Sequence, residues 1–423
     1  MSLQAGVSME RKTTLFFSFR SVLILSASLG YFYYLLRRPY PGIAFLPEDV
    51  WRIKLLAAAS KSYSFIVRMC EKIGWSSEIA VLRRLYHFEA LLLARKPKTK
   101  IHKQDVDLGN VRCVLYRKAS WVPTVILRPC VIYLHGGGWV FTTVEERDAH
   151  HRHIVDRADV NVVAVEYRKA PEHPFPAAFN DCYNAVKFIH STFERFGVDK
   201  DRISLCGDSA GGNLAAAVAT RLRDEGLNLL KHQILIYPGV QFITFSLNSH
   251  LRKFPLLSKE DCVWCMLTYL GESQSLAEVI YNGNHISEDL LEHPAFFALE
   301  RYQSTPFRIS KPVISSTTTE SSRGDSVHHD FELTRFREKI KDPSLCPLMA
   351  ASMRGLPTTL LLLCDFDVLL DDGLVYADRL KSDNVPVTVI TVPGHHGCFR
   401  NFQSTKCGAL MMDHLVGFLR ANL

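Results

Sequence analysis

The sequence predicts an α/β fold in which helices flank a mostly parallel central sheet. From residue 130 onward, short apolar runs typical of buried strands alternate with stretches typical of helices. Several of these runs end in polar or glycine-rich segments, and open α/β sheets place their sites at that edge. The chain has 423 residues. Without an amino-terminal segment of about 40 residues it is long enough for one large α/β domain or two small ones.

The first informative strand is the apolar run at residues 130–134, which ends in the sequence His-Gly-Gly-Gly-Trp at 135–139. Consecutive glycines let backbone N–H groups turn toward one point. Acyl transfer needs such donors, because each stabilises the oxyanion of the tetrahedral intermediate by about 3 kcal/mol. The alternatives are a flexible loop or a phosphate cradle. The Lys-Ser/Thr pair or GxGxxG pattern of a cradle does not follow the strand.

A second apolar run, at residues 203–206, leads into Gly-Asp-Ser-Ala-Gly at 207–211, and a helical stretch at 213–223 follows. Strand, sharp turn and helix form the context in which a Gly-x-Ser-x-Gly pattern indicates a nucleophile. The turn holds Ser209 in a strained conformation that exposes its hydroxyl. A helix N-cap is the simpler interpretation of the same pattern. The N–H of Ala210 is the usual additional oxyanion donor.

A serine nucleophile needs a base, and the base needs an orienting acid. The apolar run at residues 358–364 predicts a further strand, and four carboxylates follow it, at Asp365, Asp367, Asp371 and Asp372. Asp371 and Asp372 precede a helical pattern and are expected to start that helix by capping and charge–dipole attraction. Asp365 lies so close to the strand that its side chain is expected to turn away. We therefore favour Asp367.

The strand predicted at residues 385–392 ends in Pro-Gly-His-His-Gly. We prefer His396, which precedes a glycine, as the base, with His395 as the alternative. Any single histidine among the seventeen of this chain is more often structural than catalytic. His173, in an Ala-Pro-Glu-His-Pro segment, is expected to be structural.

Together these motifs resemble the hormone-sensitive-lipase branch of the α/β-hydrolases, the GDXG lipolytic enzymes. The greatest similarity is to its membrane-anchored arylacetamide deacetylase-like group. The resemblance runs from about residue 130 to about residue 420, and its combination of motifs is highly specific. The matching segments are residues 135–139, 167–178, 207–213 and 367–373.

The resemblance implies hydrolysis of carboxylic esters, and in some members of aryl amides, through an acyl-enzyme. It implies Ser209 as nucleophile, His396 as base and Asp367 as orienting acid. No cofactor or metal is implied. The residues implied for the oxyanion hole are His135, Gly136, Gly137, Gly138 and Ala210.

The resemblance also divides the chain. It implies a signal-anchor or transmembrane segment at residues 1–40, amino-terminal cap or linker helices at 41–105, and a catalytic α/β-hydrolase domain at 106–423. A cap insertion at about 240–345 is expected to cover the serine and shape an apolar acyl pocket. The amphipathic stretch at 50–66 is expected to pack in this cap and not to rest on a bilayer.

Three positions depart from the family pattern. Leu370 stands where the family often has an arginine in the acid loop, which puts the rigidity of that loop in doubt. Val140 stands where close relatives often have a cysteine, so a disulfide to the region of Cys364 does not carry over. Residues 315–325 are rich in serine and threonine, and predict a disordered loop insertion.

Residues 13–36 are mostly apolar and, at 1.5 Å per residue, would reach about 36 Å as a helix, enough to cross a bilayer. Arg20 lies near one end and can extend to the interface. The tyrosines and arginines that close the run resemble an interfacial belt. A cleaved signal peptide is the alternative, but no small-x-small site follows.

The orientation of this anchor is not fixed by charge, since basic residues flank both ends. The positive-inside rule leans toward a cytosolic catalytic domain. The family implies a single-pass type II protein whose domain faces the lumen of the endoplasmic reticulum. We follow the family.

The net charge of +7 is spread along the chain without a basic block, which argues against nucleic acid as a partner. Eleven cysteines include one Cys-x-x-Cys pair, Cys262 and Cys265, which lacks the second half of a zinc site. We interpret this pair as helix core packing. The sequence carries no signal of oligomeric state.

Three functions fit the motifs. The first is a membrane-anchored serine esterase or deacetylase that takes apolar esters partitioned from lipid. The second keeps the chemistry but is a neutral-lipid lipase. The third is a catalytically idle ligand-binding protein on the same scaffold, which the complete set of catalytic residue types disfavours.

Overall fold

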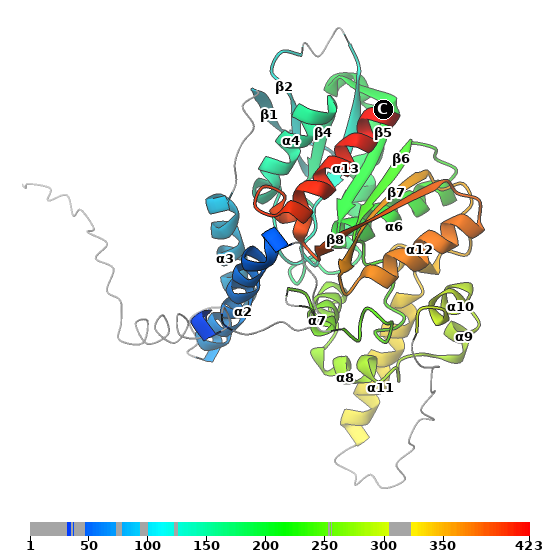
Figure 1. Cartoon of the computed structure of the whole chain (residues 1–423). Coiled ribbons are helices and arrows are strands. Elements are labelled where there is room, and N and C mark those ends of the chain that lie inside the picture. The colour runs from blue at the N-terminus through cyan, green and yellow to red at the C-terminus, as the bar shows by residue number, and fades with distance from the viewer. Residues whose placement is uncertain are drawn as a thin grey trace, which may run out of the picture.

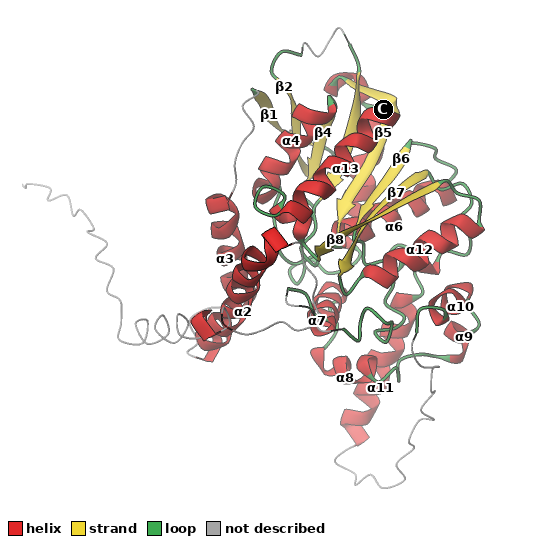
Figure 2. Ribbon diagram, viewed as in Figure 1, coloured by secondary structure: helices red, strands yellow, loops and turns green. Residues whose placement is uncertain are grey.

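A central sheet organises the protein, whose computed structural model describes residues 32–34, 37, 47–72, 78–93, 100–121, 126–252, 254, 256–303 and 323–423. Within these residues eight strands form one sheet in the order β1-β2-β4-β3-β5-β6-β7-β8 (Figures 1 and 2). The strands are β1 (Ile101–Asp107), β2 (Arg112–Lys118), β3 (Arg128–Leu134), β4 (Asn161–Val165), β5 (Val198–Asp208), β6 (His232–Ile236), β7 (Thr358–Phe366) and β8 (Val387–His395).

Helices cover both faces of the sheet (Figure 1). Helices α4 and α13 pack on one face, and α5, α6 and α12 belong to the core on the other. The described helices are α2 (Val50–Lys72), α3 (Glu78–Leu93), α4 (Asp148–Ala158), α5 (Ala177–Ser191), α6 (Ala210–Asp224), α7 (Lys259–Leu270), α8 (Ala277–Tyr281), α9 (Glu288–Leu291), α10 (Pro294–Glu300), α11 (Arg323–Ile340), α12 (Leu370–Ser382) and α13 (Lys406–Asn422).

The six strands from β4 to β8 in the sheet order run parallel, as the sequence predicts. Their side chains alternate between two cores. On β3, Ile132 and Leu134 join the core under α5 and α6, whereas Val131 and Tyr133 join the core under α4 and α13. Burial on both faces explains why these strands are continuous apolar runs in the sequence.

Strands β1 and β2 form an antiparallel edge that the sequence did not indicate. In β1 only Ile101 is buried, so no apolar run marks it. The strand also begins five residues before 106, the residue at which the catalytic domain was expected to start. The expected boundary therefore falls inside a strand of the sheet.

The helices α7 to α11 lie beyond the carboxyl edge of the strands, between β6 and β7 in the chain (Figure 1). Helix α7 begins with a capping box, in which the Ser258 hydroxyl accepts the Asp261 N–H and the Asp261 carboxylate accepts the Ser258 N–H. This fixes where the chain turns from the sheet into the helical segment.

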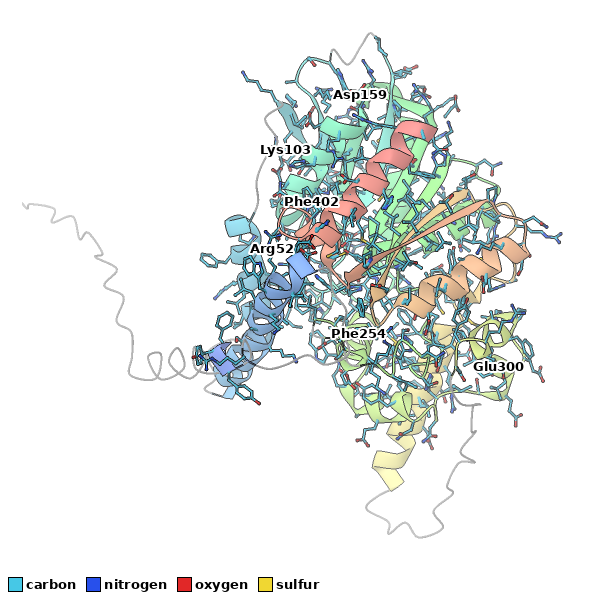
Figure 3. The ribbon with its side chains drawn as sticks, viewed as in Figure 1. Arg52, Lys103, Asp159, Phe254, Glu300 and Phe402 are labelled. Carbon is cyan, nitrogen blue, oxygen red and sulfur yellow. The ribbon has the colours of Figure 1, made fainter. Side chains whose placement is uncertain are left out.

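The helical pair α2–α3 precedes the sheet in the chain, and the residue directly before α2 contacts the start of α13. The Asp49 carboxylate accepts the N–H groups of Lys406 and Cys407, at 2.8 and 3.0 Å, and so caps α13. Figure 3 shows this neighbourhood, with Arg52 on α2 and Phe402 before α13 labelled. On α2, Ile53 is buried.

Two expectations concern segments that the structure hardly describes. No helix among the described residues is long and apolar enough to cross a membrane. The anchor expected at 13–36 lies outside them apart from residues 32–34. Of the loop expected at 315–325, only residues 323–325 are described, and they begin α11.

Candidate active site

The Gly-Asp-Ser-Ala-Gly segment forms a tight turn between β5 and α6. Ser209 adopts φ 55° and ψ −118°, a backbone conformation that is strained for a residue with a side chain. The flanking glycines allow the turn to close, because a Cβ atom on Gly207 would lie 2.1 Å from the carbonyl oxygen of Gly211. A Cβ atom on Gly211 would lie 2.0 Å from the carbonyl oxygen of Leu134 on β3. The serine is therefore held at the end of the strand and is partly exposed.

Three predicted side chains lie in hydrogen-bonding distance of one another. The Oγ atom of Ser209 is 3.1 Å from Nε2 of His396. On the other side of the ring, Nδ1 of His396 lies 2.9 Å from Oδ2 and 3.1 Å from Oδ1 of Asp367. Asp367 is fully buried, while the His396 side chain keeps 13% of its surface exposed. The arrangement can orient the imidazole and let it take a proton from the serine.

The loop after β7 shapes the surroundings of Asp367. Its Oδ1 atom also accepts the N–H of Leu369 at 2.8 Å, which fixes the carboxylate relative to the backbone. The ring of Tyr237 lies 4.6 Å from the ring of His396. The imidazole is thus held between a buried carboxylate and an aromatic wall.

The other three carboxylates after β7 have different partners. Asp365 turns away as expected, and its Oδ1 atom accepts the N–H of Gly394 at 2.9 Å, which ties β7 to the end of β8. Burial raises the pKa of Asp365. Its role is therefore in the backbone that carries the histidine loop.

The capping roles expected for Asp371 and Asp372 are wrong. Both lie in the first turn of α12, where charge–dipole attraction was expected, but the N-cap position is Leu369, which makes no side-chain cap. Asp371 accepts the N–H of Ser249 at 2.7 Å, and Asp372 lies 3.0 Å from Nε2 of His250. These bonds attach the helix to the segment after β6.

The remaining candidate histidines lie apart from the serine. Nδ1 of His395 is 2.7 Å from the carbonyl oxygen of His396, and the ring is buried. His173 is exposed, and its N–H donates to the carbonyl of Lys169. Of the two histidines considered as base, His396 is the one whose ring lies beside Ser209.

The glycine loop after β3 divides its N–H groups between two tasks. The N–H of Gly136 donates at 2.9 Å to Oδ1 of Asp208, so it is not available to a substrate. Gly137, Gly138 and Ala210 line the same cavity as Ser209. Ala210 is the first residue of α6, where an N–H has no partner within the helix.

The oxyanion assignment of His135 also needs correction. Its ring is fully buried, stacks on Tyr167 at 4.3 Å between ring centres, and has Nδ1 2.9 Å from the carbonyl oxygen of Gly136. Burial lowers the pKa of His135 to about 4, so the ring is neutral at physiological pH. His135 and Gly136 therefore shape the loop, and the residues expected at the oxyanion hole that line the cavity are Gly137, Gly138 and Ala210.

The buried ion pair of Arg147 and Asp208 supports the glycine loop. Arg147 donates from Nη2 to Oδ2 of Asp208 at 2.7 Å, and Tyr133 donates from its hydroxyl to Oδ1 at 2.7 Å. Burial acts to raise the pKa of Asp208, but the charge of Arg147 and the hydrogen bonds outweigh it and lower this pKa. Asp208 is thus an anion that connects the elbow to the glycine loop through Gly136. Asp208 is visible in the sequence as part of the serine motif, but its hydrogen bond to the glycine loop is not.

A cavity of about 430 Å³ opens over Ser209. Its walls are mainly aromatic and aliphatic, as in many small-molecule sites. Helix α3 contributes Leu82 and Tyr86, and α7 contributes Trp264. Other apolar lining residues are Trp139, Phe141, Phe242, Phe245, Leu256, Leu257 and Leu369.

The interpretation of Cys262 and Cys265 as core packing is confirmed for Cys262, which packs against the main core, but it misses a second feature of the pair. Both are partly exposed and line the cavity, because the face of α7 that carries them lies over the glycine loop. Helical periodicity alone does not distinguish a face that packs on a core from one that covers a cavity.

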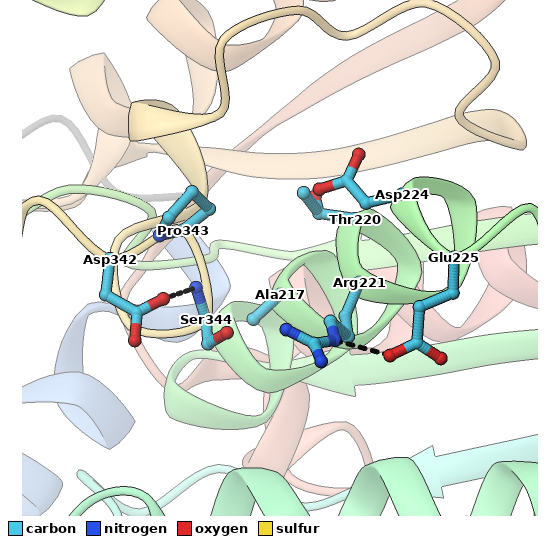
Figure 4. Close-up of a pocket in the computed structure, with 8 residues that line it drawn as sticks. All are labelled: Ala217, Thr220, Arg221, Asp224, Glu225, Asp342, Pro343 and Ser344. Carbon is cyan, nitrogen blue, oxygen red and sulfur yellow. Dashed lines mark hydrogen bonds and ion pairs between the residues drawn. The ribbon is translucent and has the colours of Figure 1, made fainter.

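A second hollow lies away from the serine. A polar depression of about 210 Å³ lies between α6 and the segment after α11, and includes Arg221 and Asp342 (Figure 4). Its lining shares no residue with the cavity over Ser209. Among the described residues no group of three or more His, Cys, Asp or Glu side chains is placed to hold a metal ion.

Comparison with protein families matches residues 131–302 and 312–400 to the alpha/beta hydrolase fold. The chain belongs to this family. The matched residues include the glycine loop, the serine elbow, Asp367 and His396. The family extends over the strands from β3 to β8, so the antiparallel edge and the α2–α3 pair precede the matched part.

This α/β-hydrolase has curated relatives over most of its length. It is similar to arylacetamide deacetylase of Bos taurus, with 33% identity over 394 residues that cover 89% of this chain and 93% of the relative. It is also similar to neutral cholesterol ester hydrolase 1 of Mus musculus, with 30% identity over 89% of this chain and 92% of the relative.

Solved structures of ester hydrolases share the fold of this α/β-hydrolase. An ester hydrolase from the metagenome of Lake Arreo, in complex with a bipyridine phosphonate derivative, superposes with a TM-score of 0.63 at 25% identity, covering 89% of this chain and 99% of that one. The carboxylesterase EstE1 from a metagenomic library has a TM-score of 0.56 at 27% identity, covering 82% and 97%.

Proposed function

We propose that this α/β-hydrolase is a serine esterase that cleaves carboxylic esters, and aryl amides by the same chemistry, through an acyl-enzyme. The observation that carries the proposal is the continuous hydrogen-bonded series from Ser209 through His396 to buried Asp367. The relatives named as deacetylases and ester hydrolases support the same reaction class.

In this mechanism Nε2 of His396 takes the hydroxyl proton of Ser209 as its oxygen attacks the ester carbonyl. Asp367 holds the imidazole in the required tautomer and stabilises the imidazolium. The carbonyl electrons move to the oxygen, and that oxyanion receives hydrogen bonds from the N–H groups of Gly137, Gly138 and Ala210. His396 then protonates the leaving alcohol or amine. Water, activated by the same imidazole, hydrolyses the acyl-enzyme and restores the serine.

The cavity favours apolar acyl or alcohol groups as substrates. Its aromatic walls would bury an apolar group next to the serine, and burial contributes roughly 25 cal/mol per Å² of apolar surface. The charges of Arg147 and Asp208 at its base neutralise each other, so they offer little to an ionic substrate. We assign residues 240–345, with 41–105, to the cap that encloses this cavity.

The membrane assignment is part of the proposal. It rests on the apolar run at 13–36, which we assign as a single-pass type II anchor. The implied location is the endoplasmic reticulum, with the catalytic domain in the lumen. Labelling of intact and opened microsomes with a fluorophosphonate probe tests the side of the membrane, because a lumenal enzyme reacts with an impermeant probe only after opening.

The decisive test of the reaction uses the variant Ser209→Ala. Wild-type protein is expected to react covalently with a fluorophosphonate and to turn over p-nitrophenyl butyrate, and the variant should do neither. Ser191→Ala, an exposed serine at the end of α5, is the matched control and should behave as wild type. Labelling of Ser209→Ala at the wild-type rate would reject Ser209 as nucleophile. Absence of turnover by the wild type would favour an idle ligand-binding protein.

A second candidate is a neutral-lipid lipase. It is favoured by the likeness to a protein named neutral cholesterol ester hydrolase and by the apolar cavity. A series of p-nitrophenyl esters with increasing acyl length separates the two. For a deacetylase, kcat/KM is expected to be highest with acyl groups of two to four carbons, about tenfold above that for longer acyl chains. For a lipase, kcat/KM is highest with long acyl chains.

A further inference from the structure

We propose that Arg83, on helix α3 outside the matched family region, is a positioning residue for the oxyanion donor Gly138. The inference rests on the proposed esterase function. The Arg83 side chain lies 55 residues before Gly138 in the chain.

The guanidinium of Arg83 holds two loops that adjoin the cavity. Its Nε atom donates at 2.9 Å to the carbonyl of Val140, directly after the glycine loop. One Nη2 hydrogen bond of 2.8 Å goes to the carbonyl of Ala170. The Nη1 and Nη2 atoms also donate to the carboxylate of Glu172, at 2.7 and 2.9 Å, and form a bidentate pair with it. Four bonds from one planar group fix its orientation, which a lysine ammonium cannot reproduce.

The bond to Val140 begins a chain of peptide groups that ends at the cavity. The carbonyl of Val140 belongs to the same peptide unit as the N–H of Phe141. That N–H donates at 2.8 Å to the carbonyl of Gly137. The carbonyl of Gly137 in turn belongs to the same planar unit as the N–H of Gly138, which lines the cavity beside Ser209. Each link therefore fixes the next peptide plane.

The hydrogen bonds in this series all point from the guanidinium toward the cavity, and this direction favours catalysis. A cation at its start draws electron density along successive N–H···O=C bonds, because hydrogen bonds in series polarise one another. The polarisation makes the last N–H, that of Gly138, a stronger donor to an oxyanion. The donor also needs no reorientation during the reaction, which is the main source of oxyanion stabilisation.

A second bond braces the same loop. The N–H of Ala170 donates at 3.1 Å to the carbonyl of Trp139, while the carbonyl of Ala170 accepts from Arg83. Arg83 is thus joined to both residues after Gly138, to Val140 directly and to Trp139 through Ala170. Glu172 balances its charge at the surface, where the carboxylate is half exposed. Because Arg83 lies on α3, the position of this helix also helps to fix the position of the glycine loop at 136–138.

The test compares Arg83→Met and Arg83→Lys with Arg84→Met, a matched change of the next, exposed arginine on α3. The full-length proteins are compared with p-nitrophenyl butyrate, after the active sites are counted by complete fluorophosphonate labelling. We expect Arg83→Met to lower kcat by about tenfold to 100-fold, with KM within about threefold. Arg83→Lys should recover only part of the loss, and Arg84→Met should equal wild type.

A trifluoromethyl ketone inhibitor distinguishes positioning from general damage, because its serine adduct carries a negative oxygen where the oxyanion forms. Its inhibition constant should rise in the same ratio as kcat/KM falls. A loss explained by partial unfolding would instead disappear once active sites are counted. If Arg83→Met keeps wild-type kcat and inhibitor affinity, the proposal is wrong. That result would not contradict the proposed esterase function, because the comparison of wild type with Ser209→Ala tests that function separately.

Discussion

The backbone N–H of Ser249 donates a 2.7 Å hydrogen bond to the carboxylate of Asp371. The hydroxyl of the same serine donates at 2.8 Å to the carbonyl of Val368, the residue after Asp367. Ser249 lies in the segment that leads from the sheet to α7, so this segment fixes the loop that carries the proposed orienting acid. Hydrogen bonds from another part of the chain therefore hold the loop in which Leu370 stands.

We therefore expect Ser249→Ala to lower both stability and turnover. Loss of the hydroxyl leaves the buried carbonyl of Val368 without this partner, which should reduce the free energy of unfolding by about 1 to 3 kcal/mol. Looser placement of Asp367 should lower kcat about threefold to tenfold with little change in KM. Urea denaturation and ester kinetics measure the two effects. Ser249→Thr keeps the hydroxyl and should recover most of the turnover; equal kcat in wild type and Ser249→Ala would contradict this role.

The choice among the acids after β7 is tested by Asp367→Asn and Asp365→Asn. Asp367→Asn should lower kcat about 10³- to 10⁴-fold, because an amide no longer favours the productive tautomer of His396. Asp365→Asn retains an oxygen that can accept the Gly394 N–H, so its kcat should stay near wild type. Steady-state ester hydrolysis gives both values. The opposite ranking of the two variants would move the orienting role to Asp365.

The parts of this fold that the sequence predicted are those whose local pattern has one physical cause. Strands β3, β5 and β7 are buried on both faces, and this requires the apolar runs that mark them. The serine elbow is visible because glycine alone tolerates the close backbone approaches at 207 and 211. Strand β1 has no such signature, since it lies at the sheet edge with a single buried residue.

The supporting contacts around the site were not predictable in the same way. Arg83 meets Val140, and Arg147 meets Asp208, across gaps of 57 and 61 residues that no periodicity encodes. The buried pair of His250 and Asp372 joins positions 122 residues apart. Of these contacts, only the one made by Asp208 could have been expected from the sequence. A charged residue at the end of an apolar strand requires a buried partner.

A contact between the glycine loop and α7 gives a third prediction. A Cβ atom on Gly138, whose φ is +60°, would lie 2.5 Å from Sγ of Cys265. Gly138→Ala should therefore displace the loop or the helix and lower kcat by about 100-fold, as for loss of an oxyanion donor. The double variant Gly138→Ala with Cys265→Gly removes the steric clash and should recover part of this loss, while the backbone strain remains. Measurement of kcat for both variants tests this prediction. If kcat does not recover in the double variant, backbone strain at position 138 alone causes the loss.

The buried histidines predict loss of stability in mild acid. Burial lowers the pKa of His285 to about 4, and its Nε2 atom lies 2.9 Å from the carbonyl oxygen of Ile243. Because the pKa in the unfolded chain is about 6.5, the unfolded state binds more protons between these values. The stabilising contribution is complete above pH 6.5 and is lost as the pH falls toward 4. This one group should remove about 2 kcal/mol between pH 7.5 and pH 5.

The variant His285→Gln isolates this group, because a glutamine amide can donate to the same carbonyl but does not titrate. Wild type is expected to lose about 2 kcal/mol more unfolding free energy than the variant when the pH is lowered from 7.5 to 5. Urea denaturation at the two pH values measures this difference. His102→Gln, at an exposed position on β1, is the control and should keep the wild-type pH dependence. If the stability curves of wild type and His285→Gln run parallel between pH 7.5 and 5, proton uptake by His285 on unfolding does not contribute. The acid sensitivity would then have to arise from the other buried histidines, such as His150 and His151, whose pKa values burial also lowers.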